Sequence, residues 1–124
     1  MAAPNIVNVA TINGKTTYAN LSTTSTTSLI SNAASSGKVF KVNNIFVSNV
    51  NGVSAADITV SFHTAASAGG TAYKIASTVS VPADSTLVVL DKSGALYLEE
   101  NTSISVAAGT AGYLQVVASY EEIS

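Results

Sequence analysis

His63 is the only histidine, and its imidazole is the side chain best suited to acid–base chemistry near neutral pH. Ser61 lies two positions earlier in an alternating segment, so the two side chains would share one face of a strand. A nucleophile beside its base is the arrangement of a hydrolase. Asp57 is on the same face but about 20 Å away, at ~3.3 Å per residue, which is too far to orient the imidazole. We therefore expect His63 to be a solvated strand residue, and no catalytic residue is assigned.

Carboxylates are the second kind of side chain that could do chemistry, and they include two adjacent pairs, Glu99–Glu100 and Glu121–Glu122. Paired carboxylates hydrolyse glycosides and bind metal ions. Neighbouring residues on a strand point to opposite faces, so neither pair forms an acid–base dyad by itself. Cysteine is absent, and no calcium-loop, phosphate-loop or dinucleotide-binding motif occurs. The sequence therefore predicts no enzyme activity, no metal site and no cofactor.

Five tyrosines are the remaining side chains that could hold a ligand, because their rings could stack on sugars. Tryptophan, which would serve that purpose better, is absent. We expect Tyr73 and Tyr97 to be ordinary sheet residues. A host-surface carbohydrate-binding module stays open as an alternative function.

The charge of the chain argues for an assembly subunit. The 124 residues carry a net charge of −2, five lysines and no arginine, which argues against nucleic-acid binding. Apolar residues are dispersed, so no membrane span is expected, and the first residues do not resemble a signal peptide. Charged residues make up 10% of the chain, against roughly 25% in soluble domains. A surface so poor in charge is weakly protected against association, which suits a subunit packed among others.

The elements that position these residues are strands. Apolar residues alternate with polar ones, as at Ile58, Val60 and Phe62, and β-branched residues are abundant throughout. Short strands separated by frequent turns are typical of a two-sheet antiparallel β-sandwich, either immunoglobulin-like or jelly-roll-like. We expect a single all-β domain over residues 1–124. Strands are predicted at residues 5–12, 15–21, 26–31, 38–49, 56–63, 72–81, 86–91, 95–99, 102–107 and 113–121.

Turn residues separate the predicted strands. Tight turns are predicted at Asn13–Gly14, Asn51–Gly52, Gly69–Gly70 and Ser93–Gly94, with further turns at Pro82–Ser85 and 109–112. The run 38–49 cannot keep one register, because Val42 and Ile45 have opposite parity and both are apolar. We therefore predict a bulge at Asn43–Asn44, where one extra residue resets which side chains point inward.

The alternation also predicts the core and leaves one segment ambiguous. The segment 21–32 is rich in Ser and Thr, and it is either a poorly packed edge strand or loop, or an arm that orders against a neighbour. Residues 1–35 as a whole are a candidate N-terminal arm or edge region. The predicted core is Phe40, Val42, Ile45, Val47, Ile58, Val60, Phe62, Leu96, Leu98, Ile104, Val106, Leu114 and Val116.

Several motifs in the last two thirds of the chain resemble one known family. They are GKVFKV at residues 37–42, IFVSNV at 45–50, VSVPADSTL at 79–87, LYLEENT at 96–102 and ASYEEIS at 118–124. This pattern resembles small β-sandwich virion proteins of tailed bacteriophages, especially those of marine cyanobacteria. The motifs are strands and turns, so the family has no catalytic, cofactor-binding or metal-binding residues to carry over.

The resemblance implies a structural role in a virion. The expected function is a capsid decoration or cement protein that binds the outside of the major capsid protein lattice and stabilises it. A tail, neck or fibre component is the alternative within the same class. The expected partners are the major capsid protein and further copies of the chain, as a homo-oligomer for which a trimer is the expected form. The expected location is the capsid surface of the virion, after synthesis in the host cytoplasm.

Overall fold

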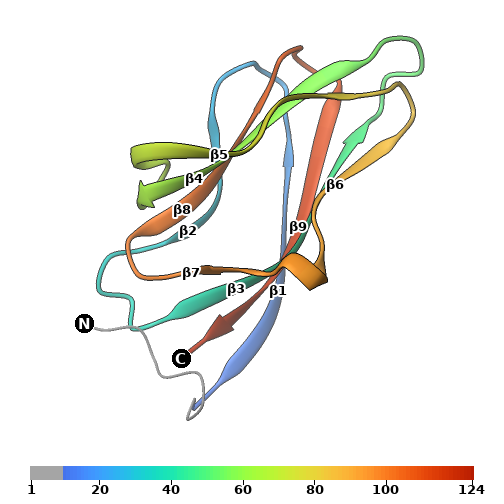
Figure 1. Ribbon diagram of the computed structural model, residues 1–124. Helices are drawn as coiled ribbons and strands as arrows, with labels where there is room; N and C mark the ends of the chain where they lie inside the picture. The colour runs from blue at the N-terminus through green and yellow to red at the C-terminus, as the bar shows by residue number, and fades with distance from the viewer. Residues whose placement is uncertain (1–9) are drawn as a thin grey trace.

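A computed structural model describes residues 10–124 as two antiparallel sheets packed face to face (Figure 1). The alternating segments form strands, as their β-branched residues predict. The strands are β1 (Ile12–Asn20), β2 (Thr27–Asn32), β3 (Val39–Asn49), β4 (Ala56–Ala65), β5 (Gly69–Val81), β6 (Thr86–Leu90), β7 (Leu96–Leu98), β8 (Thr102–Ala108) and β9 (Leu114–Ile123). One turn of 3-10 helix, η1 (Lys92–Gly94), separates β6 from β7.

The strand order is that of a jelly roll. Sheet A has the order β1-β9-β3-β6, with β7 pairing β3 beyond the end of β6. Sheet B has the order β2-β8-β4-β5. Successive strands cross from one sheet to the other, except at the β4–β5 and β6–β7 connections. The predicted two-sheet sandwich is therefore confirmed, and of the two expected types it is the jelly-roll one.

The core lies between the sheets and agrees with the alternation. Phe62 and Leu96 are half-buried and pack against the core, whereas the sequence predicts both inside it. The other predicted core residues are buried, and they are Phe40, Val42, Ile45, Val47, Ile58, Val60, Leu98, Ile104, Val106, Leu114 and Val116. Burial of these side chains is the main term that holds the two sheets together.

The predicted bulge in β3 is confirmed. The register of β3 against β9 shifts between Val42 and Asn44. Val42 and Ile45 are both fully buried, as the resetting of the inward face requires. The amide oxygen of Asn44 accepts a hydrogen bond from the backbone N–H of Ser119 at 3.2 Å, which partners an amide that the bulge leaves free.

The predicted tight turns are confirmed in part. Asn13–Gly14 is wrong, since it lies inside β1, and β9 pairs with every residue of β1 from Ile12 to Asn20. Gly69–Gly70 is also misplaced, because both glycines begin β5 and the turn itself lies at 66–68. Asn51–Gly52 lies in a loop that crosses from β3 to β4 and is not a hairpin turn. Ser93–Gly94 does form a tight turn, within η1, where the Gly94 N–H donates to the Asp91 carbonyl at 3.1 Å. The turn at Pro82–Ser85 is confirmed by a hydrogen bond from the Ser85 N–H to the Pro82 carbonyl. The strand predicted at 5–12 falls mostly outside the described residues.

The Ser/Thr-rich segment places apolar side chains in the core. Leu21, Leu29 and Ile30 are buried, with exposed fractions of 2%, 8% and 3%. β2 pairs with β8 and forms one edge of sheet B. Within residues 1–35, the segments 12–20 and 27–32 are thus strands of the two sheets.

Candidate assembly surfaces

His63 is buried, not solvated as the sequence predicts. Its exposed fraction is 6%, although it points to the outer face of sheet B, opposite to the core. Its Nε2 lies 2.6 Å from the Ser105 hydroxyl on the neighbouring strand β8, and Ser61 is not its partner. Alternation therefore predicts the correct face for His63. The prediction that this face is open to solvent is wrong.

The turn between β4 and β5 lies against this outer face. The Ser103 hydroxyl donates to the Ala65 carbonyl at 2.7 Å and accepts from the Ala68 N–H at 2.9 Å. The Ser67 N–H donates to the Ser31 hydroxyl at 2.9 Å. Ser103 pairs directly with His63 in the sheet, so the turn closes beside the histidine. The turn thus lies over the part of the outer face where the sequence predicts a solvated His63.

The His63–Ser105 pair lacks the surroundings that a nucleophile needs. Ser105 is 2% exposed, so a substrate has no access to its hydroxyl. The Nδ1 of His63 is buried with no hydrogen-bond partner, so no carboxylate orients the ring. The pair joins β4 to β8, and its contribution is structural.

The carboxylates are held apart by separate partners. Glu100 accepts from the Gly37 N–H at 3.1 Å, and Glu121 accepts from the Asn43 side chain at 3.1 Å. Glu99 is exposed at the end of β7. Over residues 10–124, no three histidine or carboxylate side chains are grouped so that they could hold a metal ion.

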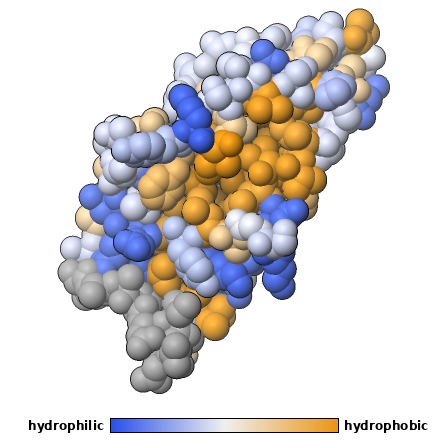
Figure 2. All heavy atoms as spheres, in the orientation of Figure 1, coloured by the Kyte–Doolittle hydropathy of each residue, from blue (hydrophilic) through white to orange (hydrophobic). Residues whose placement is uncertain are grey.

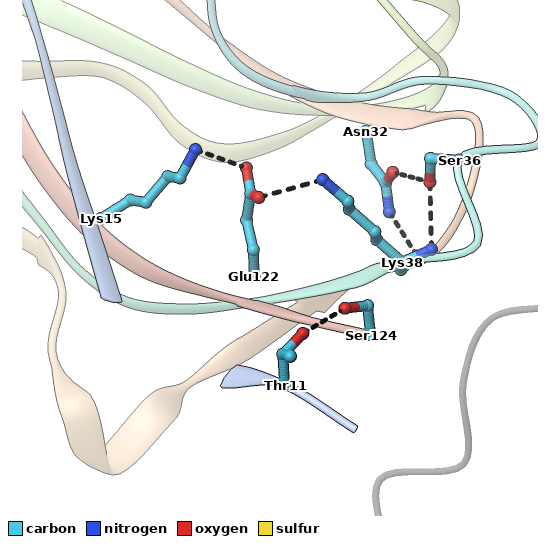
Figure 3. A network of polar contacts seen from close by, with 7 residues as sticks. All are labelled: Thr11, Lys15, Asn32, Ser36, Lys38, Glu122 and Ser124. Carbon is cyan, nitrogen blue, oxygen red and sulfur yellow. Dashed lines mark hydrogen bonds and ion pairs between the residues drawn. The ribbon is translucent and has the colours of Figure 1, made fainter. Parts of the chain in front are cut away.

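Glu122 is the centre of a polar network at one end of the sandwich (Figure 3). Its carboxylate lies 3.3 Å from the Lys15 amine and 3.2 Å from the Lys38 amine. This links β1 and β9 to the residue just before β3. Burial raises the pKa of the neighbouring Tyr120 hydroxyl, and the negative charge of Glu122 raises that pKa further. The network holds these strands together, and two lysines share its one carboxylate.

A buried asparagine completes this end of the molecule. The Asn32 side chain donates to the Lys38 carbonyl at 2.8 Å and accepts from the Ser36 hydroxyl (Figure 3). It also donates to the Leu98 carbonyl at 3.0 Å. Nearby, the hydroxyls of Thr11 and Ser124 are within hydrogen-bond distance. Asn32 has no exposed surface, and its partners satisfy the polar atoms that burial removes from water.

An apolar row crosses the outer face of sheet A from edge to edge. Tyr18 in β1 lies opposite Val117 in β9, Val117 lies opposite Phe46 in β3, and Phe46 lies opposite Val88 in β6. Their exposed fractions are 80%, 41%, 36% and 49% in that order. We call these four residues the outer row. Because contiguous apolar side chains on a surface are typical of interaction sites, the outer row is a candidate interaction surface.

The outer row has uncharged neighbours on both sides. One flanking row is Asn20, Gln115, Ser48 and Thr86, and the other includes Thr16, Ser119 and Asn44. A hollow of about 190 Å³ adjoins the row and is lined by residues 18–20 and 115–117. The surface thus offers apolar contact and neutral hydrogen-bonding groups without charge.

The outer row is not evident from the alternation of single strands. A signal is present, since Phe46 stands between two inward residues, Ile45 and Val47, and Val117 stands between Val116 and Ala118. An apolar residue at an outward position is unremarkable by itself. Only the registers of four strands reveal that these residues align.

A second apolar area lies where the two sheets separate. Figure 2 shows apolar residues gathered between β5 and β6, in the same view as Figure 1. Several hydrophobic residues of β4, β5, β6 and β7 pack against the core but stay half-buried, and they are Phe62, Ala76, Leu87, Val89, Leu90 and Leu96. Phe62 and Leu96 are therefore less buried than the alternation predicts.

In the part of the chain that the structure describes, no helix has the length and apolar character needed to cross a membrane.

Comparison with known proteins supports the fold. No protein-family model and no curated protein sequence matches the chain. Among solved structures, the chain is similar to a protein of Bacillus endospore appendages, described as disulfide-linked pili, with a TM-score of 0.52 and 11% identity. The similarity covers 92% of this chain and 88% of that one.

A virus structure gives a second match. A chain of infectious bursal disease virus, Gx strain, has a TM-score of 0.50 and 10% identity over 93% of this chain. This chain spans 32% of that protein's length. A Podospora anserina mannanase with a carbohydrate-binding module gives a TM-score of only 0.38, from which nothing is argued. At these identities the likeness concerns the fold alone: the chain has a sandwich fold that also occurs in a pilus protein and in a virus protein.

Proposed function

We propose that the chain is a virion structural protein, and more narrowly a decoration protein on the outside of the major capsid protein lattice of a tailed bacteriophage. The observation that carries the proposal is the uncharged outer row across sheet A. The sandwich fold that it shares with a pilus protein and a virus protein supports a structural role. The motifs quoted for the phage family narrow that role to a virion.

A flat apolar row suits docking onto a repeated surface. Sheet A presents four strands side by side, and the rows around Phe46 carry amides and hydroxyls, which pair with backbone groups of a partner. Few ion pairs are available, because charged residues make up 10% of the chain. Any assembly of this chain is also held without disulfides, unlike the pili named above, because cysteine is absent.

The test is co-sedimentation with assembled shells of the phage that encodes the chain. Phe46→Lys places a charge in the middle of the outer row, and we expect binding to fall by roughly tenfold or more, because the charge must be desolvated. The matched control is Val53→Lys, since Val53 is 89% exposed in the β3–β4 loop, outside the row. Equal binding by both variants and the unmodified protein would count against docking through the outer row.

Copy number and location separate this proposal from its alternatives. Quantitative mass spectrometry of purified particles should find hundreds of copies, the order expected when a lattice offers a repeated symmetric site. A few copies localised to the tail would instead indicate a neck, baseplate or fibre component. Binding to host glycans, with no copies in the particle, would indicate a carbohydrate-binding module.

A further inference from the structure

β1 is the most regular of the sheet edges. It pairs with β9 over nine residues without a register shift. In contrast, β2 shifts register between Ser28 and Ile30, and β5 shifts at three places against β4. η1 separates β6 from β7. Bulges and breaks of this kind protect an edge from pairing with another chain, and β1 has neither.

The free side of β1 presents backbone groups to an extended strand. No described strand pairs with that side, because β1 ends the order of sheet A. An open edge accepts a further strand through N–H and C=O groups, which is a recurrent mode of recognition. Lys15 is the one charged residue of β1, and its amine lies 3.3 Å from the Glu122 carboxylate, which also pairs with Lys38.

Two residues of β1 indicate which strand fits. Gly14 and Tyr18 both point to the outer face of sheet A, since their partners in β9 are Glu121 and Val117. A Cβ placed on Gly14 would meet no atom within 4 Å, so open space lies above this glycine. Tyr18 is 80% exposed, so the residues that the structure describes leave its ring largely uncovered.

We propose that β1 pairs with β1 of a second copy, antiparallel about a two-fold axis at Thr16. In that register residue i faces residue 32 − i, so Tyr18 of each copy lies across from Gly14 of the other. An aromatic ring that covers a cross-strand glycine is a known way to stabilise such a pair. Lys15 faces Thr17 and Ile12 faces Asn20, so no like charges are opposed. A second copy therefore offers a strand of the same length whose Tyr18 fits the open space at Gly14.

The product would be a continuous sheet with the strand order β6-β3-β9-β1-β1-β9-β3-β6. Both outer rows would then lie on one face of the dimer. This inference concerns the free protein and does not depend on capsid binding. A dimer without affinity for shells, or a monomer that binds shells, would separate the two proposals.

Cysteine substitution tests the register directly, because the chain has no cysteine of its own. Thr16→Cys should form disulfide-linked dimers under mild oxidation, because directly opposed Cα atoms in antiparallel strands are about 4.5–5.5 Å apart. Tyr18→Cys alone should not, since its two copies are displaced by about 13 Å along the strands at ~3.3 Å per residue. A mixture of the Gly14→Cys and Tyr18→Cys proteins should cross-link again.

The control for random collision is Val88→Cys, which lies on the same face but on β6 and is 49% exposed. Cross-linking of Thr16→Cys no faster than that of Val88→Cys would overturn the proposal. Efficient cross-linking of Tyr18→Cys with itself would overturn the register at Thr16.

A second variant separates association from folding. Gly14→Val fits the monomer, because the space above Gly14 is open and valine favours strands. The same change fills the space that Tyr18 of the other copy requires, so we expect the dimer to weaken roughly tenfold or more in sedimentation equilibrium. The control is Thr86→Val, an exposed position of β6 on the same face, which should leave the dimer unchanged. A monomer at all concentrations up to about 1 mM, or a dimer that Gly14→Val does not weaken, would refute the proposal.

Discussion

His63 and Ser105 illustrate, at the scale of single residues, how potentially reactive groups become part of a sheet. The imidazole and the hydroxyl are 2.6 Å apart and both are buried. A hydrogen bond between buried groups stabilises a fold mainly because leaving either group unpaired is costly. The partner of His63 is on the neighbouring strand, which explains why sequence proximity pointed to Ser61.

Removing His63 should therefore destabilise the protein. His63→Ala leaves the Ser105 hydroxyl without its partner and opens a space in the outer face of sheet B, so we expect a loss of about 1–3 kcal/mol in the free energy of unfolding. Urea unfolding followed by circular dichroism measures this loss. In a double-mutant cycle, Ser105→Ala should cost less in the His63→Ala background than alone. Unchanged stability in His63→Ala would show that the pair contributes nothing to the fold.

The sequence could place His63 on the correct face but could not show its burial. The cover comes from the turn 65–68, whose contacts with Ser103 and Ser31 span more than thirty residues of chain. Alternation describes one strand at a time and contains no such information. The outer row could not be predicted for the same reason, because Tyr18 and Val88 are aligned only through the pairing of four strands.

At the scale of elements, the sequence was most informative where strands run without interruption. Alternation predicted most of the buried apolar residues of β3, β8 and β9, though not Val39, Ala108 or Ile123, and a change of parity predicted the bulge at Asn43–Asn44. The sequence was least informative at Asn13–Gly14, where a turn sequence lies within β1 because pairing with β9 outweighs the local preference. Whether a turn sequence forms a turn or continues a strand depends on pairing with a distant strand, and the local sequence does not reveal that pairing.

Two paired residues of sheet B, both predicted to lie in the core, differ in burial. Ile104 in β8 is fully buried, whereas Phe62, directly opposite in β4, is half-buried. Ile104→Ala should therefore lower the free energy of unfolding by about 2–5 kcal/mol, and Phe62→Ala should cost less than the 3–5 kcal/mol typical of a fully buried phenylalanine. Chemical denaturation of both variants tests this. A larger loss in the free energy of unfolding for Phe62→Ala than for Ile104→Ala would contradict the half-buried position of Phe62.

Hydrogen bonds at the start of η1 affect the pKa of Asp91. The Asp91 carboxylate accepts hydrogen bonds from the Ser93 hydroxyl at 2.5 Å and the Ser93 N–H at 3.1 Å. These bonds lower the pKa of Asp91 below its ordinary 3.8, the side-chain bond having the largest effect. The contribution of the Asp91 carboxylate to the stability of the folded state is thus present above pH 3.8. It is lost as the pH falls through the lower pKa that Asp91 has in the folded state.

Ser93→Ala should accordingly raise the pKa of Asp91 toward 3.8. The measurement is a carbon-detected NMR titration of the carboxyl group. The variant Ser85→Ala, in the turn before β6, serves as the control and should leave that pKa in place. An unchanged value in Ser93→Ala would show that the hydroxyl is not the main partner of the carboxylate.

At the scale of the whole molecule, the low charge predicts how any association responds to salt. Ion pairs between exposed charges weaken as salt screens them, and the outer row and β1 present almost none. Association should therefore change by less than about threefold between roughly 0.05 M and 0.5 M salt, as measured by sedimentation equilibrium or shell binding. A steep fall with salt would indicate that charged side chains dominate the interface.

The interruption of the edge strand at η1 has a consequence for growth. If copies join through β1, the other edge of each sheet A is the broken line of β6, η1 and β7, which offers no continuous template for a third copy. Addition of copies along this sheet then stops at two. A protein with so few charges to keep its molecules apart would otherwise be at risk of forming open-ended fibrils when concentrated. In such a dimer, the turn of 3-10 helix η1 would therefore limit further growth of the sheet.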